Sequence, residues 1–155
     1  VIVSRPEMKA LRTYTDGMFG SIANIRFVNG VPAGGPGDSL AKALQYVETI
    51  GVLIVLGDTI FKFKSSEEKT INQLEDLVLV EEVTEHERWC MAKVGEDSVI
   101  RRFIDKSDVQ EPDTKALIGV YKISDSRLFA SELEEASAKR HMDRPGWILG
   151  LKIPC

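Results

Sequence analysis

The stretch Val52-Leu-Ile-Val-Leu-Gly-Asp58 is the most informative part of the chain. Its five consecutive apolar residues have the length of a strand that is covered on both faces of a sheet. Gly57 permits a ligand to approach the backbone closely, and a carboxylate follows at once in Asp58. Because ligands gather beyond the carboxyl ends of strands in open α/β sheets, we expect Asp58 to face a crevice, free to bind Mg²⁺ together with substrate phosphates. An equally weighted alternative is that Asp58 caps a turn or is solvated in a loop.

The elements that precede this stretch alternate between strands and helices. Residues 1–3 and 22–28 are rich in β-branched side chains and predict strands. A helix is expected between them, and a second helix begins with Asp38 or Ser39 as its N-cap. Residues 1–58 therefore read β-α-β-α-β, which indicates a mostly parallel sheet with helices on both faces.

The second half of the chain changes to consecutive short strands. The candidates are residues 77–83, 88–94, 99–104 and 117–123. Gly95-Glu-Asp97 predicts a hairpin turn between two of them, and a last helix follows Ser124 or Asp125. We expect a single domain over residues 1–155, with a first half at 1–60 and a second at 76–140.

Composition excludes several classes of protein. The chain has 155 residues, with 24 acidic and 20 basic side chains, and a net charge of −4 argues against a nucleic-acid binder. No apolar run approaches the ~20 residues of a membrane span. The two cysteines, Cys90 and Cys155, and the two histidines argue against a zinc site. So few cysteines are compatible with a reducing compartment, and we expect a cytoplasmic protein.

Two further segments have residues suited to phosphate chemistry. Ala33-Gly-Gly-Pro-Gly-Asp-Ser-Leu40 leads a glycine-rich loop into a helix N-terminus, where amide groups and the helix dipole suit an anion or the polar edge of a nucleotide. Phe103-Ile-Asp-Lys106 ends a strand with an ammonium that can neutralise a phosphate. Taken alone, each segment is more often a plain loop with an N-cap or a solvated charge pair.

Taken in order, four blocks of sequence resemble the sugar-1-phosphate nucleotidyltransferases, also called nucleotide-sugar pyrophosphorylases. The blocks are Gly37-Asp-Ser-Leu-Ala-Lys-Ala43, Leu53-Ile-Val-Leu-Gly-Asp58, Glu87-Arg-Trp-Cys-Met-Ala92, and Phe103-Ile-Asp-Lys106 with Ala116-Leu-Ile-Gly-Val-Tyr121. The Gly-Asp strand and the pairing of Lys106 with Gly119-Val-Tyr121 are the more specific parts. The likeness spans roughly residues 1–135.

The resemblance implies a Rossmann-like, GT-A-type α/β fold and a defined chemistry. A nucleotidyl group would pass from a nucleoside triphosphate to a sugar 1-phosphate, with release of pyrophosphate. Asp58 would hold Mg²⁺ against the α-phosphate, and Lys106 would contact the sugar phosphate. The region of Gly37 would meet the nucleoside, and the backbone at Cys90 and Gly119 would face the sugar. By analogy alone, the product would supply polysaccharide synthesis.

The sequence also departs from the family pattern. The family opens with a strand, a GGxGTRL loop and a lysine, which this chain lacks, and Trp147-Ile-Leu-Gly150 has no counterpart of the family's second metal-binding aspartate. Cys90 stands where glycine is usual, Asp105 where glutamate is usual, and Ser107 where proline is usual. We therefore expect the family's fold without its first βα unit.

Three interpretations stay open at this point. The chain is a portion of a catalytic enzyme, or a short relative that keeps the scaffold for binding nucleotide or sugar phosphate or for assembly, or an unrelated α/β protein. An incomplete sheet exposes backbone edges. Edge pairing into a homodimer is therefore expected in either of the first two cases.

Overall fold

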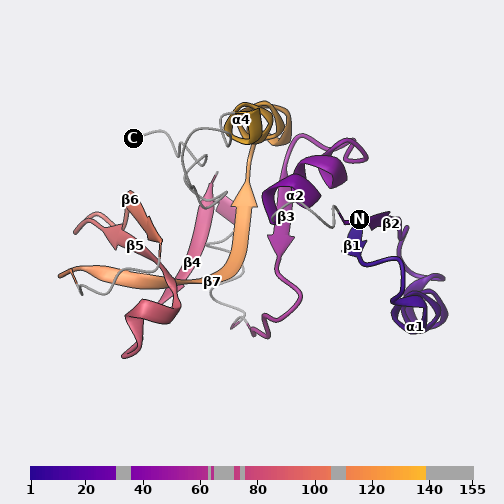
Figure 1. The fold of residues 1–155 in the computed structure, drawn as a ribbon, viewed down its shortest axis with the longest axis horizontal. Coiled ribbons are helices and arrows are strands. Elements are labelled where there is room, and N and C mark those ends of the chain that lie inside the picture. Colours follow the sequence, from indigo (N-terminus) through magenta and orange to yellow (C-terminus); the bar gives the residue numbers. More distant parts are fainter. Residues whose placement is uncertain (31–35, 63, 65–71, 74–75, 106–110, 139–155) are drawn as a thin grey trace. The chain divides into compact units, whose positions relative to one another are not determined.

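The computed structural model describes residues 1–30, 36–62, 64, 72–73, 76–105 and 111–138 (Figure 1). These residues fall into two compact units. The first holds Val1–Thr49 and the helix that starts at Ser126, and the second holds Ile50–Asp125. Because the last helix belongs with the first residues of the chain, the units are not consecutive in sequence.

The described residues of the first unit combine a small parallel sheet with helices. Its elements are β1 (Ile2–Ser4), α1 (Lys9–Phe19), β2 (Phe27–Asn29), α2 (Pro36–Leu44) and α4 (Ser126–Ala138). β1 and β2 run parallel, with Val3 opposite Val28, because the crossover through α1 returns the chain in the same direction. α4 packs on α2 (Figure 1) and buries Phe129 and Leu133, which share one face of the helix.

Side chains tie these helices to the rest of the first unit. The Arg12 guanidinium on α1 donates to Ser4 Oγ at 3.4 Å and to Asn29 Oδ1, and these two residues end β1 and β2. The buried Ser126 hydroxyl donates to the Thr49 carbonyl at 2.8 Å. This second hydrogen bond joins the start of α4 to the segment that follows α2.

The second unit is an antiparallel sheet arranged around one long strand, β7. Its elements are β3 (Val52–Val55), β4 (Leu77–Glu81), the short 3₁₀ turn η1 (His86–Arg88), β5 (Cys90–Val94), β6 (Ile100–Asp105) and β7 (Thr114–Ile123). β7 pairs antiparallel with β3, β4 and β5, and β6 pairs antiparallel with β5 (Figure 1).

The register shows that β7 has two successive partners along one edge. β4 pairs with β7 from Ala116 to Lys122. Ala116 also pairs with β5, and Lys122 also pairs with β3. Because β4 occupies one edge of β7 at these residues, β5 and β3 must share the opposite edge. β5 covers residues 114–116 of that edge and β3 covers residues 120–123. Residues 117–119 lie between them, where β3 ends and β5 begins, and we call this segment the ladder break.

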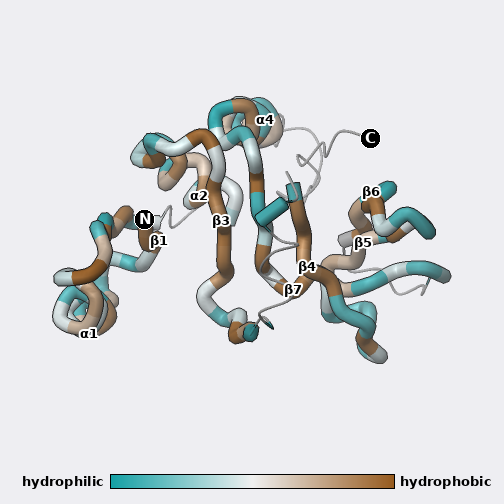
Figure 2. Tube along the Cα trace, turned by 180° about the vertical axis from the view of Figure 1, so that it is seen from behind, coloured by the Kyte–Doolittle hydropathy of each residue, from teal (hydrophilic) through white to brown (hydrophobic). Residues whose placement is uncertain are grey.

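The hydrophobic core of the second unit lies around β7. Ala92 on β5 and Ala116 on β7 have no exposed surface, and Val120 and Tyr121 are 1% and 2% exposed. Figure 2 shows β3 as a continuous hydrophobic stretch, as its sequence indicated. Burial of the side chains on β5 and β7, with the half-buried Val52 and Ile54 of β3, holds β3, β4 and β5 on β7. This packing fixes the ends of β3 and β5 at the ladder break.

The α/β class and the strands of the second half are confirmed, but the expected pairing needs correction. In the described residues, parallel pairing occurs only between β1 and β2. The apolar strand β3 instead lies antiparallel to β7. β3 is also not covered on both faces as expected, because Leu53 and Val55 are 57% and 43% exposed. A continuous apolar run records neither how many faces of a strand are covered nor the direction of its neighbour, so the prediction of a mostly parallel sheet was wrong for these strands.

Two element boundaries also differ from the expectation. α2 begins at Pro36, so Asp38 and Ser39 lie inside its first turn and neither is the N-cap. Proline suits the first turn because its missing N–H costs no helical hydrogen bond there. β2 is limited to Phe27–Asn29, whereas residues 22–28 were expected. Among the helices of the described residues, none has the length and apolarity needed to cross a membrane.

Candidate functional site

The ladder break is bonded to a tight turn that follows β3. The Leu56 N–H donates to the Gly119 carbonyl at 2.9 Å, which extends the β3 ladder by one residue. The Thr59 N–H then donates to the Leu56 carbonyl at 3.1 Å and closes a four-residue turn with Gly57 and Asp58 at its centre. The turn is therefore attached to β7 immediately before Asp58.

A side-chain hydrogen bond attaches the turn on its other side. The Thr59 hydroxyl donates to the Ile118 carbonyl at 2.8 Å, across 59 residues of sequence. Both the Ile118 and Gly119 carbonyls of the ladder break thus receive hydrogen bonds from the turn. Buried carbonyl groups need such partners, and here the chain that leaves β3 supplies them.

Gly119 is required by this arrangement. Its φ is +83°, a left-handed conformation that side chains disfavour. A Cβ at this position would lie 2.6 Å from Thr59 Oγ1 and 3.1 Å from the Leu56 side chain. The absence of a side chain at Gly119 therefore lets the turn approach β7.

Asp58 is exposed at the centre of the turn, as the alternative of a solvated turn residue predicted. Because β3 runs antiparallel to β7, the expectation that ligands gather beyond the carboxyl ends of strands, which holds for parallel sheets, does not apply to Asp58. No residue in the described part of the chain forms a hydrogen bond or ion pair with the Asp58 carboxylate. The described residues also contain no group of three acidic, histidine or cysteine side chains that could enclose a metal. A single free carboxylate fits Mg²⁺ that shares its remaining ligands with phosphates and water. Asp58 can thus supply one protein ligand.

Gly57 leaves open space beside Asp58. A Cβ built on Gly57 would meet no atom within 4 Å, so the folded chain itself does not require glycine here. Close approach of a ligand to the backbone is a reason for glycine that is compatible with this open space.

Cys90 lies at the other end of the ladder break. It begins β5 and pairs with Asp105 on β6. Because the next residue of β5, Met91, pairs with Ala116 in the antiparallel ladder, Cys90 lies beside Leu117 of β7. Burial raises the pKa of Tyr121 to about 12, with a smaller contribution from Cys90. The structure therefore brings Gly57, Asp58, Gly119 and Cys90 together around the ladder break.

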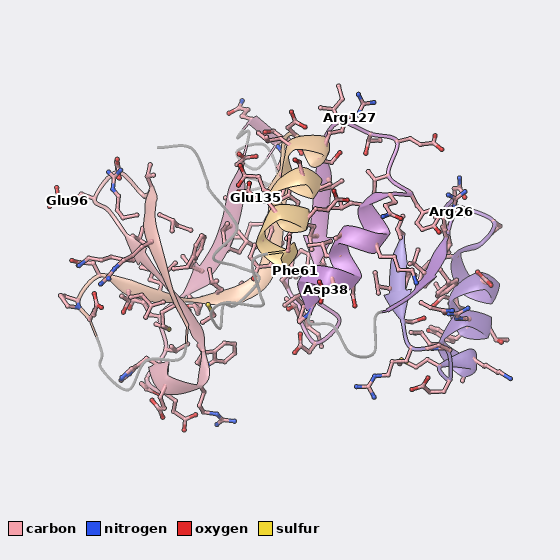
Figure 3. The ribbon with its side chains drawn as sticks, turned by 45° about the horizontal axis from the view of Figure 1, so that its top comes forward. Arg26, Asp38, Phe61, Glu96, Arg127 and Glu135 are labelled. Atoms are coloured by element: carbon pink, nitrogen blue, oxygen red, sulfur yellow. The ribbon has the colours of Figure 1, made fainter. Side chains whose placement is uncertain are left out.

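The remaining predicted residues lie elsewhere. Gly37, Asp38 and Ser39 occupy the first turn of α2 in the first unit, with Gly37 buried and the other two half-buried; Asp38 is labelled on α2 in Figure 3. Its negative charge suits the helix N-terminus. Lys106 falls outside the described residues. Sequence reasoning missed Thr59, whose only signal was a hydroxyl directly after the Gly-Asp pair.

No protein-family model and no curated protein sequence matches the chain, but solved structures do. A protein assigned as a glucose-1-phosphate thymidylyltransferase from Bacillus anthracis, in complex with sucrose, is 21% identical with a TM-score of 0.68, over 98% of this chain and 59% of that one. A UDP-glucose pyrophosphorylase complexed with UDP-glucose is 17% identical with a TM-score of 0.66, over 86% and 60%. The 4-diphosphocytidyl-2C-methyl-D-erythritol synthase from Anaerococcus prevotii is 15% identical with a TM-score of 0.59, over 94% and 62%.

The chain therefore has the Rossmann-like α/β fold of nucleotidyltransferases, as the four sequence blocks implied. It spans 59% to 62% of the length of these three proteins. Structural likeness at such identities defines the fold, and function has to be argued from the site.

Proposed function

We propose that this chain contributes part of the active site of a sugar-1-phosphate nucleotidyltransferase. The observation that carries the proposal is the exposed Asp58, held in a turn that is bonded to the ladder break beside Gly119. This turn occurs in a chain with a nucleotidyltransferase fold. The substrates would be a nucleoside triphosphate and a sugar 1-phosphate, and the products a nucleotide sugar and pyrophosphate.

The proposed chemistry depends on positioning and on neutralising charge. An oxygen of the sugar phosphate attacks the α-phosphorus, and the bond to the β-phosphate oxygen breaks as pyrophosphate leaves. Such transfers need the reacting groups in line and the developing negative charge balanced. Mg²⁺, when bound, supplies positive charge against the phosphates, and Asp58 would be its ligand from this chain.

The other residues would bind and orient the substrates. Lys106 would contact the sugar phosphate, and Gly37-Asp-Ser39 would meet the nucleoside at the N-terminus of α2. Gly57 leaves room for a phosphate to approach the backbone. Cys90 and Gly119 lie at the two ends of the ladder break, where they would face the sugar.

Isothermal titration calorimetry with a panel of nucleoside triphosphates tests the proposal, with each titration run in Mg²⁺ and again in EDTA. We expect binding that Mg²⁺ strengthens and that Asp58→Asn reduces by about tenfold or more, the loss of one charged ligand. Glu96→Gln, which removes an exposed carboxylate from the β5–β6 turn of the same unit (Figure 3), is the matched control and should bind like wild type. Mg²⁺-dependent binding that survives Asp58→Asn would refute the metal role.

Pyrophosphate release separates the catalytic proposal from binding alone. With sugar 1-phosphates added, turnover that Asp58→Asn abolishes supports the catalytic reading. Binding without turnover supports the second candidate, a domain that holds nucleotide or sugar phosphate without converting it.

A cytoplasmic location, a role in polysaccharide synthesis and homodimerisation by edge pairing stay predictions. Sedimentation velocity measures the last directly.

A further inference from the structure

We propose that Thr59 is a positioning residue that fixes Asp58 for metal and phosphate binding by holding the turn on β7. The inference rests on the proposed function of Asp58. The attachment of the turn to β7 through Thr59 can be tested without any nucleotide.

The backbone of the turn holds Asp58 in place. Its side chain is exposed and makes no hydrogen bond or ion pair with another described residue, so only the backbone of the turn determines where the carboxylate lies. That backbone is anchored before Asp58 by the Leu56 N–H on the Gly119 carbonyl. After Asp58 it is anchored by Thr59, whose hydroxyl is bonded to the Ile118 carbonyl at 2.8 Å.

Binding of a metal and a phosphate needs a carboxylate that is held accurately in place. A binding group must be held within about 0.5 Å of its productive position, and a misplacement of about 1 Å can cost roughly 100-fold in rate. Without the Thr59 hydroxyl, the turn would be attached to β7 on one side of Asp58 only. The carboxylate would then sample positions that a metal shared with phosphates cannot use.

The Thr59 hydroxyl also depends on the glycine at residue 119. A Cβ at Gly119 would lie 2.6 Å from Thr59 Oγ1, so the hydroxyl occupies the space that the missing side chain leaves. Any side chain at residue 119 would push the hydroxyl from the Ile118 carbonyl. Glycine at 119 and a hydroxyl at 59 thus act as a matched pair, whether or not Gly119 faces the sugar.

Three variants separate positioning from general stability. Thr59→Val keeps the shape and removes the hydroxyl, and Thr59→Ser keeps the hydroxyl. Thr114→Val is the matched control, because the Thr114 hydroxyl makes the same kind of bond, 2.7 Å to the Glu111 carbonyl, at the start of β7 and away from the turn. Both valine variants should lower the denaturation midpoint to a similar extent.

The first readout is amide hydrogen exchange of Leu56 and Thr59 by NMR, in the absence of nucleotide. Thr59→Val should speed exchange at both amides by about tenfold, the loss expected for one hydrogen bond, while the amides of β7 keep their exchange rates. Thr59→Ser should restore protection, and Thr114→Val should leave it unchanged. Unchanged protection in Thr59→Val overturns the proposal whatever the nucleotide data show.

The second readout is Mg²⁺-dependent affinity for the nucleoside triphosphate that wild type binds best. We expect Thr59→Val to weaken it about tenfold, Thr59→Ser to stay within about twofold, and Thr114→Val to match wild type. Affinity in EDTA should not change in any variant. Wild-type affinity in Thr59→Val, or equal loss in Thr114→Val, overturns the positioning role. If wild type itself binds no nucleotide but exchange responds as expected, the proposed function fails and Thr59 is shown to hold the turn.

Discussion

Replacing Gly119 by alanine tests whether the ladder break is built as described. The backbone at this residue has φ +83°, and a left-handed alanine costs about 1–2 kcal/mol. The added Cβ would lie 2.6 Å from Thr59 Oγ1 and 3.1 Å from Leu56, so the turn must move. Loss of the Thr59 hydrogen bond adds about 1 kcal/mol. Together these effects predict a destabilisation of about 2–3 kcal/mol.

Urea denaturation followed by circular dichroism measures this change, with Gly57→Ala as the control. Gly57 has open space around its missing Cβ, so its alanine variant should stay within about 0.5 kcal/mol of wild type. If Thr59 is the obstacle, Gly119→Ala combined with Thr59→Ala should cost less than the sum of the single variants by at least about 0.5 kcal/mol. A Gly119→Ala protein as stable as Gly57→Ala would refute the reasoning.

Other residues give predictions of different kinds. Gly17 lies inside α1 with nothing within 4 Å of its missing Cβ, so Gly17→Ala should stabilise the fold by about 0.5–1 kcal/mol in the same denaturation assay. Ser126→Ala removes the hydrogen bond to the Thr49 carbonyl and should cost about 1–2 kcal/mol, whereas Ser126→Thr should retain part of it. The pKa of Tyr121 is raised from 10.0 to about 12 by burial and then by Cys90. As the pH rises, the unfolded chain therefore loses this proton before the folded chain does. The contribution of Tyr121 to the free energy of unfolding should be full below pH 10 and fall between pH 10 and 12. Tyr121→Phe should remove this part of the decline in stability.

Local features of the fold were predictable because their evidence is contained in a few consecutive residues. The apolar run Val52–Val55 is a strand, and the turn at Gly95-Glu-Asp97 joins β5 to β6, with the Gly95 N–H bonded to the Val99 carbonyl at 2.9 Å. The direction of pairing was not predictable in this way. β7 meets β3, β4 and β5, which are distant in sequence, and an apolar pattern does not record which neighbour a strand selects.

The same distinction applies to the candidate site. Asp58 was singled out because a carboxylate follows a strand that ends in glycine, and Gly119 because its segment resembles a family pattern. The structure adds that the turn around Asp58 is bonded to Gly119. Thr59 was missed because its partner is the backbone carbonyl of Ile118, 59 residues away. Every residue has such a carbonyl, so no amino-acid type marks the acceptor.

The ladder break also explains how one segment can satisfy its backbone and still be open to a ligand. A strand that exchanges one partner for another along the same edge leaves carbonyl groups that neither partner reaches, and such groups need donors when buried. A continuous strand would satisfy them and close the edge completely. Here the Leu56 amide and the Thr59 hydroxyl satisfy them from a turn, whose two central residues, Gly57 and Asp58, remain exposed. The hydrogen bonds that complete the sheet therefore place a carboxylate at its edge. For this reason, removing the Thr59 hydroxyl should weaken nucleotide binding, whereas removing the Thr114 hydroxyl should lower stability to a similar extent and leave binding unchanged.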